Sequence, residues 1–182
     1  TRVKNVLICG GGHLCFYLAN QLLQAGMQVK IIEIKEKKCE NLCELLPKAT
    51  IIHGDATDHD LLLEEGIAEA DAMVSLTGLD EENIILSLFA KTQGVNKIIA
   101  KVNEDSRAQM VEGLGIDSII SAKSATADAI MRYVRARKNS YSNANVETMY
   151  RLVNGKVEAQ EFIIRKECEY TSVPLKELRT KK

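Results

Sequence analysis

Apolar residues follow two alternating patterns along the first 138 residues of the chain. Short runs rich in Val and Ile predict β-strands, and stretches with apolar residues at helical spacing predict helices. The predicted strands are residues 6–9, 29–34, 50–53, 72–76, 97–102 and 117–120. The predicted helices are residues 13–25, 37–46, 58–65, 80–93, 105–113 and 123–138. Because strands that alternate strictly with helices run parallel through crossovers, the pattern predicts an α/β fold with a doubly wound parallel sheet of six strands.

The pattern changes after residue 138. Residues 139–145 are polar and uncharged, which is typical of a linker. Two β-like runs follow on either side of Asn154-Gly155, and this dipeptide indicates a hairpin because a type I′ turn needs positive φ at both central positions. We therefore expect residues 1–138 to form one domain and residues 146–182 to be the start of a small β-containing unit.

The composition is that of a globular protein, with 46% hydrophobic and 27% charged residues in a chain of 182. The 24 Lys and Arg residues are balanced by 25 Asp and Glu residues, so nucleic acid is not an expected partner. The five cysteines lack the paired CxxC spacing of a zinc site, and we expect a reduced, cytoplasmic chain.

The N-terminal region contains no charged side chain between Lys4 and Lys30, a length that raises the question of a membrane span. Three consecutive glycines interrupt the apolar run at residues 10–12, and polar residues such as Asn20 follow, so we expect no span. The chain opens on Thr1 rather than Met, and we expect it to be a piece of a longer protein.

The first predicted strand ends in a glycine-rich turn that opens the first predicted helix. In the GxGxxG pattern, the first glycine makes a tight turn, the second lets the backbone approach a pyrophosphate, and the third allows the helix to pack closely on the strand. Gly10 and Gly12 occupy the first two places and Cys15 the third. Phosphates are expected at the N-terminus of this helix, where free N–H groups and the helix dipole favour negative charge.

Glu33 ends the second predicted strand, 21 residues after Gly12. From this position a carboxylate binds the hydroxyls of a ribose. Ile34 and Lys35 follow it in place of an arginine that would clamp a 2′-phosphate, which favours an unphosphorylated ribose. Together these features predict a Rossmann-like nucleotide site, and the alternative is a structural glycine turn with a surface glutamate.

Two further groups of residues have alternative interpretations. His13 is placed to reach a phosphate from the loop, or it is simply exposed there. Cys39 and Cys43 share a helix face and could bind a metal with His53 or His59, but ordinary packing of the two cysteines is the favoured interpretation. No catalytic set of Ser, His and Asp or of Cys and His stands out, and we expect neither a catalytic nor a metal site.

Several motifs, taken in order, resemble one known family. They are Gly10-Gly-Gly-His-Leu14, Glu33, His53-Gly-Asp-Ala-Thr-Asp58, Ala70-Asp-Ala-Met-Val-Ser-Leu-Thr77, Asp80-Glu-Glu-Asn83 and Ile99-Ala-Lys-Val-Asn103. This set resembles the RCK/KTN family of regulatory nucleotide-binding domains from potassium channels and transporters, in particular its TrkA type from Trk potassium uptake systems. The resemblance covers residues 4–138, and residues 146–182 resemble the opening of the family's C-terminal subdomain.

The resemblance implies roles for individual residues. The phosphates would be contacted by the glycine loop through Gly10, Gly12, His13 and Leu14. Glu33, followed by Ile34, would bind the ribose. The later strands would supply Asp55 and Ala56 beside the adenine, Thr77 and Gly78 on the far side of the cleft, and Lys101 at a place where the family usually has arginine.

The resemblance also implies a function, that of a cytoplasmic regulatory domain without catalytic activity. It would bind NAD(H), or alternatively ATP/ADP, and transmit the resulting change to a membrane potassium-transport subunit at the inner face of the cell membrane. Two other functions are an NAD-dependent oxidoreductase and a structural dimerisation module. The first of these needs a substrate domain, for which only about 40 residues remain after the linker.

The predicted helix at residues 123–138 carries more apolar surface than one flank of a sheet needs. Ile130, Met131 and Val134 lie beside a four-residue repeat of Ala125, Ala129 and Tyr133. In the resembled family this crossover helix packs against a partner subunit. We therefore expect a homodimer or a larger ring.

Overall fold

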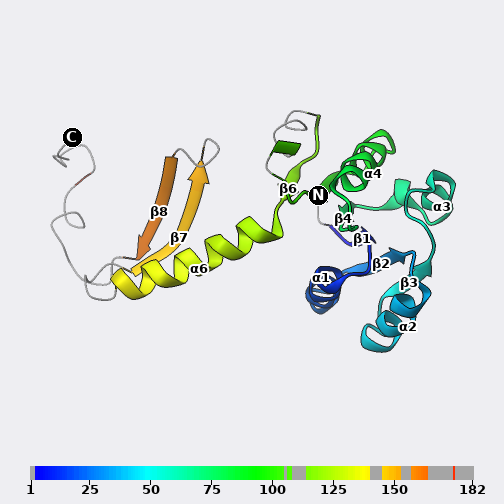
Figure 1. Cartoon of the computed structure of the whole chain (residues 1–182), viewed down its shortest axis with the longest axis horizontal. Helices are drawn as coiled ribbons and strands as arrows, with labels where there is room; N and C mark the ends of the chain where they lie inside the picture. Colours follow the sequence, from blue (N-terminus) through cyan, green and yellow to red (C-terminus); the bar gives the residue numbers. More distant parts are fainter. Residues whose placement is uncertain are drawn as a thin grey trace. The chain divides into compact units, whose positions relative to one another are not determined.

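The computed structural model describes residues 3–104, 106–107, 114–139, 145–152, 157–163 and 174. The chain divides into two compact units, residues 1–125 and 126–182. Figure 1 gives the order of the elements along the chain. Among the described helices, none combines the length and the hydropathy that a membrane span requires.

Six parallel strands form the sheet of the first unit, as predicted. They are β1 (Asn5–Cys9), β2 (Gln28–Glu33), β3 (Thr50–His53), β4 (Ala72–Ser75), β5 (Lys97–Lys101) and β6 (Ser118–Ile120). The helices between them are α1 (His13–Gln24), α2 (Glu36–Leu45), α3 (His59–Glu64), the 3-10 helix η1 (Ile67–Glu69) and α4 (Asp80–Thr92). The predicted strands and these four α-helices are confirmed, and η1 was not expected.

Both faces of the sheet are covered, which is why its central strands are apolar at successive positions. Ile8 and Ile31 have no exposed surface and share a core cluster with residues of α1 and α2. Leu7 and Ile32 face the other way, into a cluster with residues of α3 and α4. Two hydrophobic cores therefore hold the sheet between two layers of helices.

The strand order is β3-β2-β1-β4-β5-β6, and its direction reverses at β1, which pairs with both β2 and β4. In such a sheet the connections leave the switch point in opposite directions, so a crevice opens between the carboxyl ends of the neighbouring strands. All residues predicted for the nucleotide site lie at or after the carboxyl ends of β1 to β5. The topology thus brings them to one edge of the sheet.

The second unit contains most of α6 (Ala122–Asn139) and the pair β7 (Asn145–Leu152) and β8 (Val157–Ile163). These two strands are antiparallel, as in the expected hairpin. The Asn154-Gly155 turn, most of the predicted linker and most of the predicted helix at 105–113 lie outside the described residues. The domain bounds expected from the sequence stay a prediction.

We expect Ile31→Ala to destabilise the first unit, because this fully buried side chain leaves a cavity when it is truncated. The free energy of unfolding should fall by about 2–5 kcal/mol in urea titrations followed by circular dichroism. Leu45→Ala is the matched control at the end of α2, where the side chain is 61% exposed, and it should cost less than about 0.5 kcal/mol. Equal losses in the two variants would contradict the assignment of the core.

Candidate functional site

Gly10 makes the sharp turn at the end of β1. Its φ of +103° lies in the left-handed region, and its N–H donates to the Ile32 carbonyl oxygen at 2.8 Å. A Cβ atom at this position would lie 2.8 Å from the carbonyl group of Leu76 and 2.9 Å from the nitrogen of Thr77. Only glycine satisfies both conditions. The turn therefore packs directly against the chain that leaves β4.

Gly11 joins the turn to β2, a role that the sequence interpretation missed. Its N–H donates to Oε2 of Glu33 at 2.7 Å, and a Cβ here would lie 2.7 Å from Cδ1 of Leu42 and 3.0 Å from the Glu33 side chain. The sequence did contain a signal for this role. The GxGxxG pattern requires glycine at positions 10 and 12 only, so a glycine at position 11 indicates a separate structural need.

Gly12 faces open space. Its φ of −79° is one that any residue adopts, and apart from Gly12 and its two chain neighbours no atom of the described residues lies within 4 Å of a Cβ built on it. Neither the turn nor the packing therefore requires glycine here. The space beside it is the space that a pyrophosphate would fill in a dinucleotide site.

The N-terminus of α1 opens onto the same space. Gly12 supplies no side-chain cap, and the first turn carries no acidic residue. Within the described part of the chain, the N–H groups of Gly12, His13 and Leu14 have no hydrogen-bond acceptor. The side chains of His13 and Leu14 are exposed. Free N–H groups and the positive end of the helix dipole make this an anion site.

Cys15 occupies the place of the third glycine and is fully buried among residues of α1 and β1. Burial, with a smaller contribution from the Glu33 carboxylate, raises the pKa of the Cys15 thiol to about 12. Burial also raises the pKa of Cys9 to about 12. Because the thiolate is the nucleophilic form, both cysteines act as packing residues rather than nucleophiles.

Glu33 is buried at the end of β2, and the backbone fixes its carboxylate in place. Oε2 accepts the Gly11 N–H at 2.7 Å, and Oε1 accepts the Lys35 N–H at 2.9 Å. Lys38 Nζ lies 3.7 Å from Oε2 and is the nearby positive charge. A carboxylate oxygen can accept two hydrogen bonds, so the pinned group keeps capacity for ribose hydroxyls. Ile34 is exposed next to it.

The residues after β3 were expected beside the adenine. Asp55 is exposed and accepts both the N–H and the hydroxyl of Thr57 at 2.8 Å, which closes a local turn. Ala56 is nearly buried and belongs to the core cluster that contains Leu62. No contact joins these two residues to the glycine loop among the residues described. Their role at the adenine stays a prediction.

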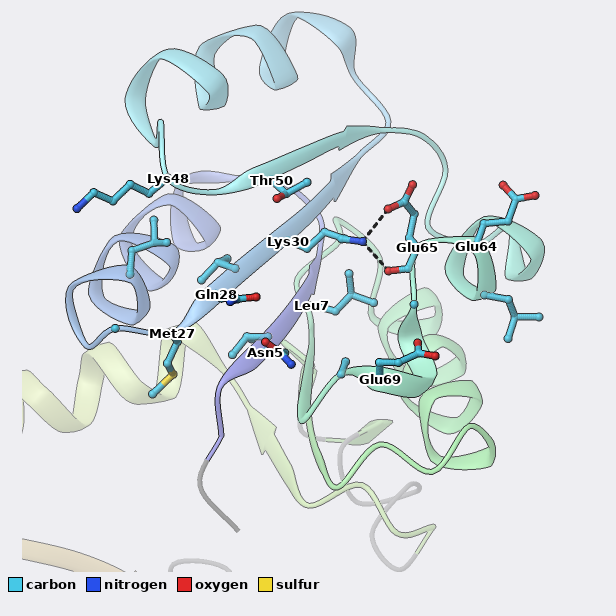
Figure 2. A pocket seen from close by; sticks show the side chains of 17 residues that line it. Asn5, Leu7, Met27, Gln28, Lys30, Lys48, Thr50, Glu64, Glu65 and Glu69 are labelled. Atoms are coloured by element: carbon cyan, nitrogen blue, oxygen red, sulfur yellow. Dashed lines mark hydrogen bonds and ion pairs between the residues drawn. The ribbon is translucent and has the colours of Figure 1, made fainter.

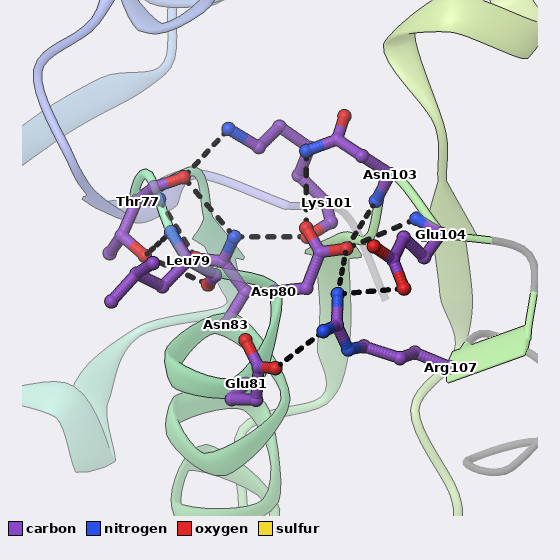
Figure 3. Close-up of polar contacts among 9 residues, drawn as sticks. All are labelled: Thr77, Leu79, Asp80, Glu81, Asn83, Lys101, Asn103, Glu104 and Arg107. Atoms are coloured by element: carbon purple, nitrogen blue, oxygen red, sulfur yellow. Dashed lines mark hydrogen bonds and ion pairs between the residues drawn. The ribbon is translucent and has the colours of Figure 1, made fainter.

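The far side of the crevice is held by α4 (Figure 3). Asn83 is fully buried and bonds to the backbone of Thr77 and of Lys101. Lys101 Nζ donates to the Thr77 carbonyl oxygen at 2.6 Å. Because Gly10 packs against Thr77, these contacts bring Gly10, Thr77 and Lys101 together at the carboxyl edge, and their role in binding a nucleotide stays a prediction.

Asp80, at the start of α4, fixes the segment that leaves β5. Its carboxylate accepts the N–H groups of Asn103 at 2.9 Å and Glu104 at 3.1 Å, and Arg107 lies 3.6 Å away. Burial alone would raise the pKa of Asp80, but these hydrogen bonds and the Arg107 charge outweigh it, so the pKa lies below its usual value. The sequence motif contained Asp80 and Asn83 but indicated neither role.

Cys39 and Cys43 show no metal chemistry in the described residues. The Cys39 thiol is buried and lies 3.2 Å from the Glu33 carbonyl oxygen, to which it donates. Cys43 is exposed. No three His, Cys, Asp or Glu side chains gather at metal-binding distance in the part of the chain described.

A cavity of about 790 Å³ lies at the opposite edge of the sheet, by the amino ends of β1, β2 and β3 (Figure 2). Inside it, Lys30 Nζ donates to the Glu65 carbonyl oxygen at 2.7 Å and pairs with its carboxylate at 2.8 Å. None of the predicted site residues lines this cavity. It is separate from the crevice at the glycine loop.

The family model described as the TrkA-N domain matches residues 6–122. The chain is 34% identical over 134 residues to the Trk system potassium uptake protein TrkA of Azorhizobium caulinodans, covering 72% of this chain and 29% of that protein. It is 33% identical over 170 residues to the TrkA protein of Halomonas elongata, covering 93% and 35%. The chain spans about a third of the length of these relatives.

Among solved structures, the fold is similar to that of the GsuK channel bound to NAD, with a TM-score of 0.58 and 16% identity, covering 84% of this chain and 26% of that chain. It is also similar to GsuK bound to ADP, with a TM-score of 0.61 and 21% identity, covering 74% and 34%. At these identities the likeness shows the fold.

Asp80→Asn should destabilise the protein at pH 7 by about 1–3 kcal/mol, because an amide offers one acceptor oxygen where the carboxylate offers two. The pKa of Asp80 is lowered by folding, so its stabilising effect is present above the unfolded-state value near pH ~4 and is lost as pH falls through the folded-state value. The difference between wild type and variant, measured by thermal unfolding, should therefore shrink as the pH falls below ~4.

Glu40→Gln, at an exposed site on α2, is the control for that measurement and should leave the pH profile as in the wild type. A constant difference between Asp80→Asn and wild type from pH 7 to pH 3 would show that the charge of Asp80 does not support the fold.

Proposed function

The chain belongs to the TrkA-N domain family, and from this membership we propose that it is a regulatory nucleotide-binding domain of a potassium uptake system. One observation carries the proposal. The open space at Gly12, with three N–H groups beside it that have no acceptor among the described residues, lies next to a carboxylate that the backbone holds in position. Anion site and carboxylate together match the phosphates and the ribose of a nucleotide.

The ligand that we propose is NAD(H), with ATP or ADP as the alternative. All of them carry an adenosine ribose and phosphates. The N–H groups at Gly12 would bind the phosphates, and the Glu33 carboxylate would bind the ribose, so the site fits each of these ligands. The GsuK channel, which has a similar fold, has been solved with NAD and with ADP. Ile34, the exposed residue that follows Glu33, is apolar where a 2′-phosphate site would carry an arginine, which favours an unphosphorylated ribose.

A regulatory rather than a redox role is supported by how the polar groups of the site are used. Both oxygens of Glu33 accept backbone N–H groups, and the ammonium of Lys101 donates to a backbone carbonyl. The buried thiols of Cys9 and Cys15 have raised pKa values. These groups build a binding site, whereas a dehydrogenase positions an acid or base toward its substrate.

The membrane partner is proposed from the relatives, which are named for potassium uptake. A ligand that binds two conformations of the domain with different affinity shifts their populations, and a membrane transport subunit in contact with the domain would respond to that shift. We place the domain on the cytoplasmic side of the membrane, where nucleotides are available.

We propose a symmetric dimer through α6. Ile130, Tyr133 and Val134 are 58%, 63% and 52% exposed, and Met131 lies beside them. An apolar surface of this kind on one helix is typical of an interface between copies of a chain.

Gly12→Val should weaken nucleotide binding at least tenfold while the protein still folds. The backbone of Gly12 suits any residue and the side chain meets no protein atom, so only the ligand loses its space. Calorimetry with NAD and ADP should show that fall in affinity, and thermal unfolding without ligand should show no more than the loss of about 1 kcal/mol expected for valine at a helix N-cap. Gly26→Val is unsuitable as a control because its φ is +81°, so Leu45→Ala serves instead. Wild-type affinity in Gly12→Val would refute the phosphate site.

The double variant Ile130→Glu, Val134→Glu should convert the dimer to a monomer, because two charges on the apolar face of α6 would be buried without partners. Sedimentation at micromolar concentration measures the change, and nucleotide binding should remain. A wild type that sediments as a monomer at every concentration would refute the interface.

A further inference from the structure

The cavity at the amino edge of the sheet lies within the first unit and takes no part in the proposed nucleotide site. Its volume of about 790 Å³ falls in the range of pockets that hold small molecules. Leu7, Lys30 and Thr50 are register partners on neighbouring strands, and all three line it. The rest of the lining comes chiefly from the end of α1, the residues before β3, and the segment where α3 passes into η1.

Lys30 brings a charge into this cavity from the middle of the sheet. It stands in β2 between Val29 and Ile31, which are buried, and its Nζ donates to the Glu65 carbonyl oxygen at 2.7 Å and to Oε2 of Glu65 at 2.8 Å. The third N–H of the ammonium and Oε1 of Glu65 have no partner among the described residues. The pair is neutral as a whole, yet it keeps one donor and one acceptor for a molecule in the cavity.

Three further charged side chains line the cavity, and opposite signs stand on opposite sides. Lys48 precedes β3, whereas Glu64 ends α3 and Glu69 ends η1. Figure 2 shows Lys48 across the cavity from Glu64 and Glu69, with Lys30 between them. In the described part of the chain, none of these three side chains has a hydrogen bond or an ion pair. Their charges are therefore available to a ligand.

Apolar side chains line the cavity as well. They include Leu7, Leu23, Met27 and Leu63, and the last of these is 48% exposed. A ligand that covers these side chains removes apolar surface from water, which favours binding. The lining therefore fits a molecule that combines charged ends with an apolar chain.

We propose that this cavity is a second ligand site, and that its ligand is a zwitterion with an ammonium group and a carboxylate at the two ends of an apolar chain. An ω-amino acid and a short peptide are molecules of this class. The carboxylate pairs with Lys48, and the ammonium group pairs with Glu64 and Glu69. The apolar chain lies over the leucine and methionine side chains between the two ends.

The charge pattern favours a zwitterion over a simple ion. The carboxylates of the cavity outnumber its lysines, so an anion such as a phosphate or a dicarboxylate is repelled. A simple amine leaves Lys48 without a partner. Only a molecule that carries both charges pairs with both sides, and this complementarity provides the specificity.

The test compares three probes of similar length. ε-Aminocaproate carries an ammonium group and a carboxylate, whereas hexylamine and hexanoate each carry only one of these charges. Two-dimensional NMR of the full chain follows the amide signals of Gly26 and Gly66, which both line the cavity. ε-Aminocaproate should shift both signals with a Kd of about 1 mM or below, and each singly charged probe should bind at least tenfold more weakly.

Variants that remove a charge assign the two ends of the ligand. Lys48→Gln should remove the advantage of ε-aminocaproate over hexylamine, because the cation that pairs with the carboxylate is gone. The double variant Glu64→Gln, Glu69→Gln should remove its advantage over hexanoate. Lys37→Gln and Glu40→Gln, at exposed positions of α2 outside the cavity, are the matched controls and should leave all three affinities within about twofold.

Three results would overturn the inference. The first is hexylamine or hexanoate binding as tightly as ε-aminocaproate, which would mean a site for a simple ion. The second is an affinity for ε-aminocaproate that Lys48→Gln and the double variant leave unchanged. The third is no shift of the Gly26 and Gly66 signals up to about 50 mM probe. All three leave the proposed nucleotide site standing, because the cavity lies at the other edge of the sheet.

Discussion

The hydrogen bond between the Gly11 N–H and the buried Glu33 carboxylate is the contact on which the site depends. It ties the end of β1 to the end of β2 and fixes the direction in which α1 begins. Because Glu33 is held from the other side by the Lys35 N–H, the loop cannot shift without breaking a charge-assisted bond in a buried place. The anion site and the carboxylate thus keep a constant separation, which is the preorganisation that a binding site needs.

On the other side of the glycine loop, hydrogen bonds between buried side chains and the backbone also fix the strand ends, but here the side chains come from the helix α4. α4 starts with Asp80 and, one turn later, carries Asn83, and these two side chains reach the ends of β4 and β5 and the segment beyond. Backbone N–H and C=O groups that lack a partner within a strand or helix form hydrogen bonds with these buried side chains instead. The two sides of the carboxyl edge are thus held in different ways, one through a strand end and the other through a helix start.

Much of this arrangement could be predicted from the sequence because its signals are local. The alternation of apolar runs and helical stretches predicts the six strands, and Gly10, Gly12 and Glu33 are recognisable from their spacing alone. The bonds of Asn83 were not predictable in this way. They join residues 6 and 18 positions apart and exist only because β4 and β5 are neighbours in the sheet. The ion pair of Lys30 was not predictable either. Lys30 stands within an apolar run, and its partner Glu65 is 35 positions away in the sequence.

The ion pairs of Lys30 and of Arg107 will respond differently to ionic strength. Lys30 and Glu65 are partly buried, and the lysine also donates to a carbonyl oxygen, so dissolved salt screens this contact little. Arg107 instead pairs with Glu81 and Glu104, whose side chains are 58% and 59% exposed. Concentrated salt therefore weakens the contacts of Arg107 with Glu81 and Glu104 after β5 more than it weakens the contact between Lys30 and Glu65 at the end of α3.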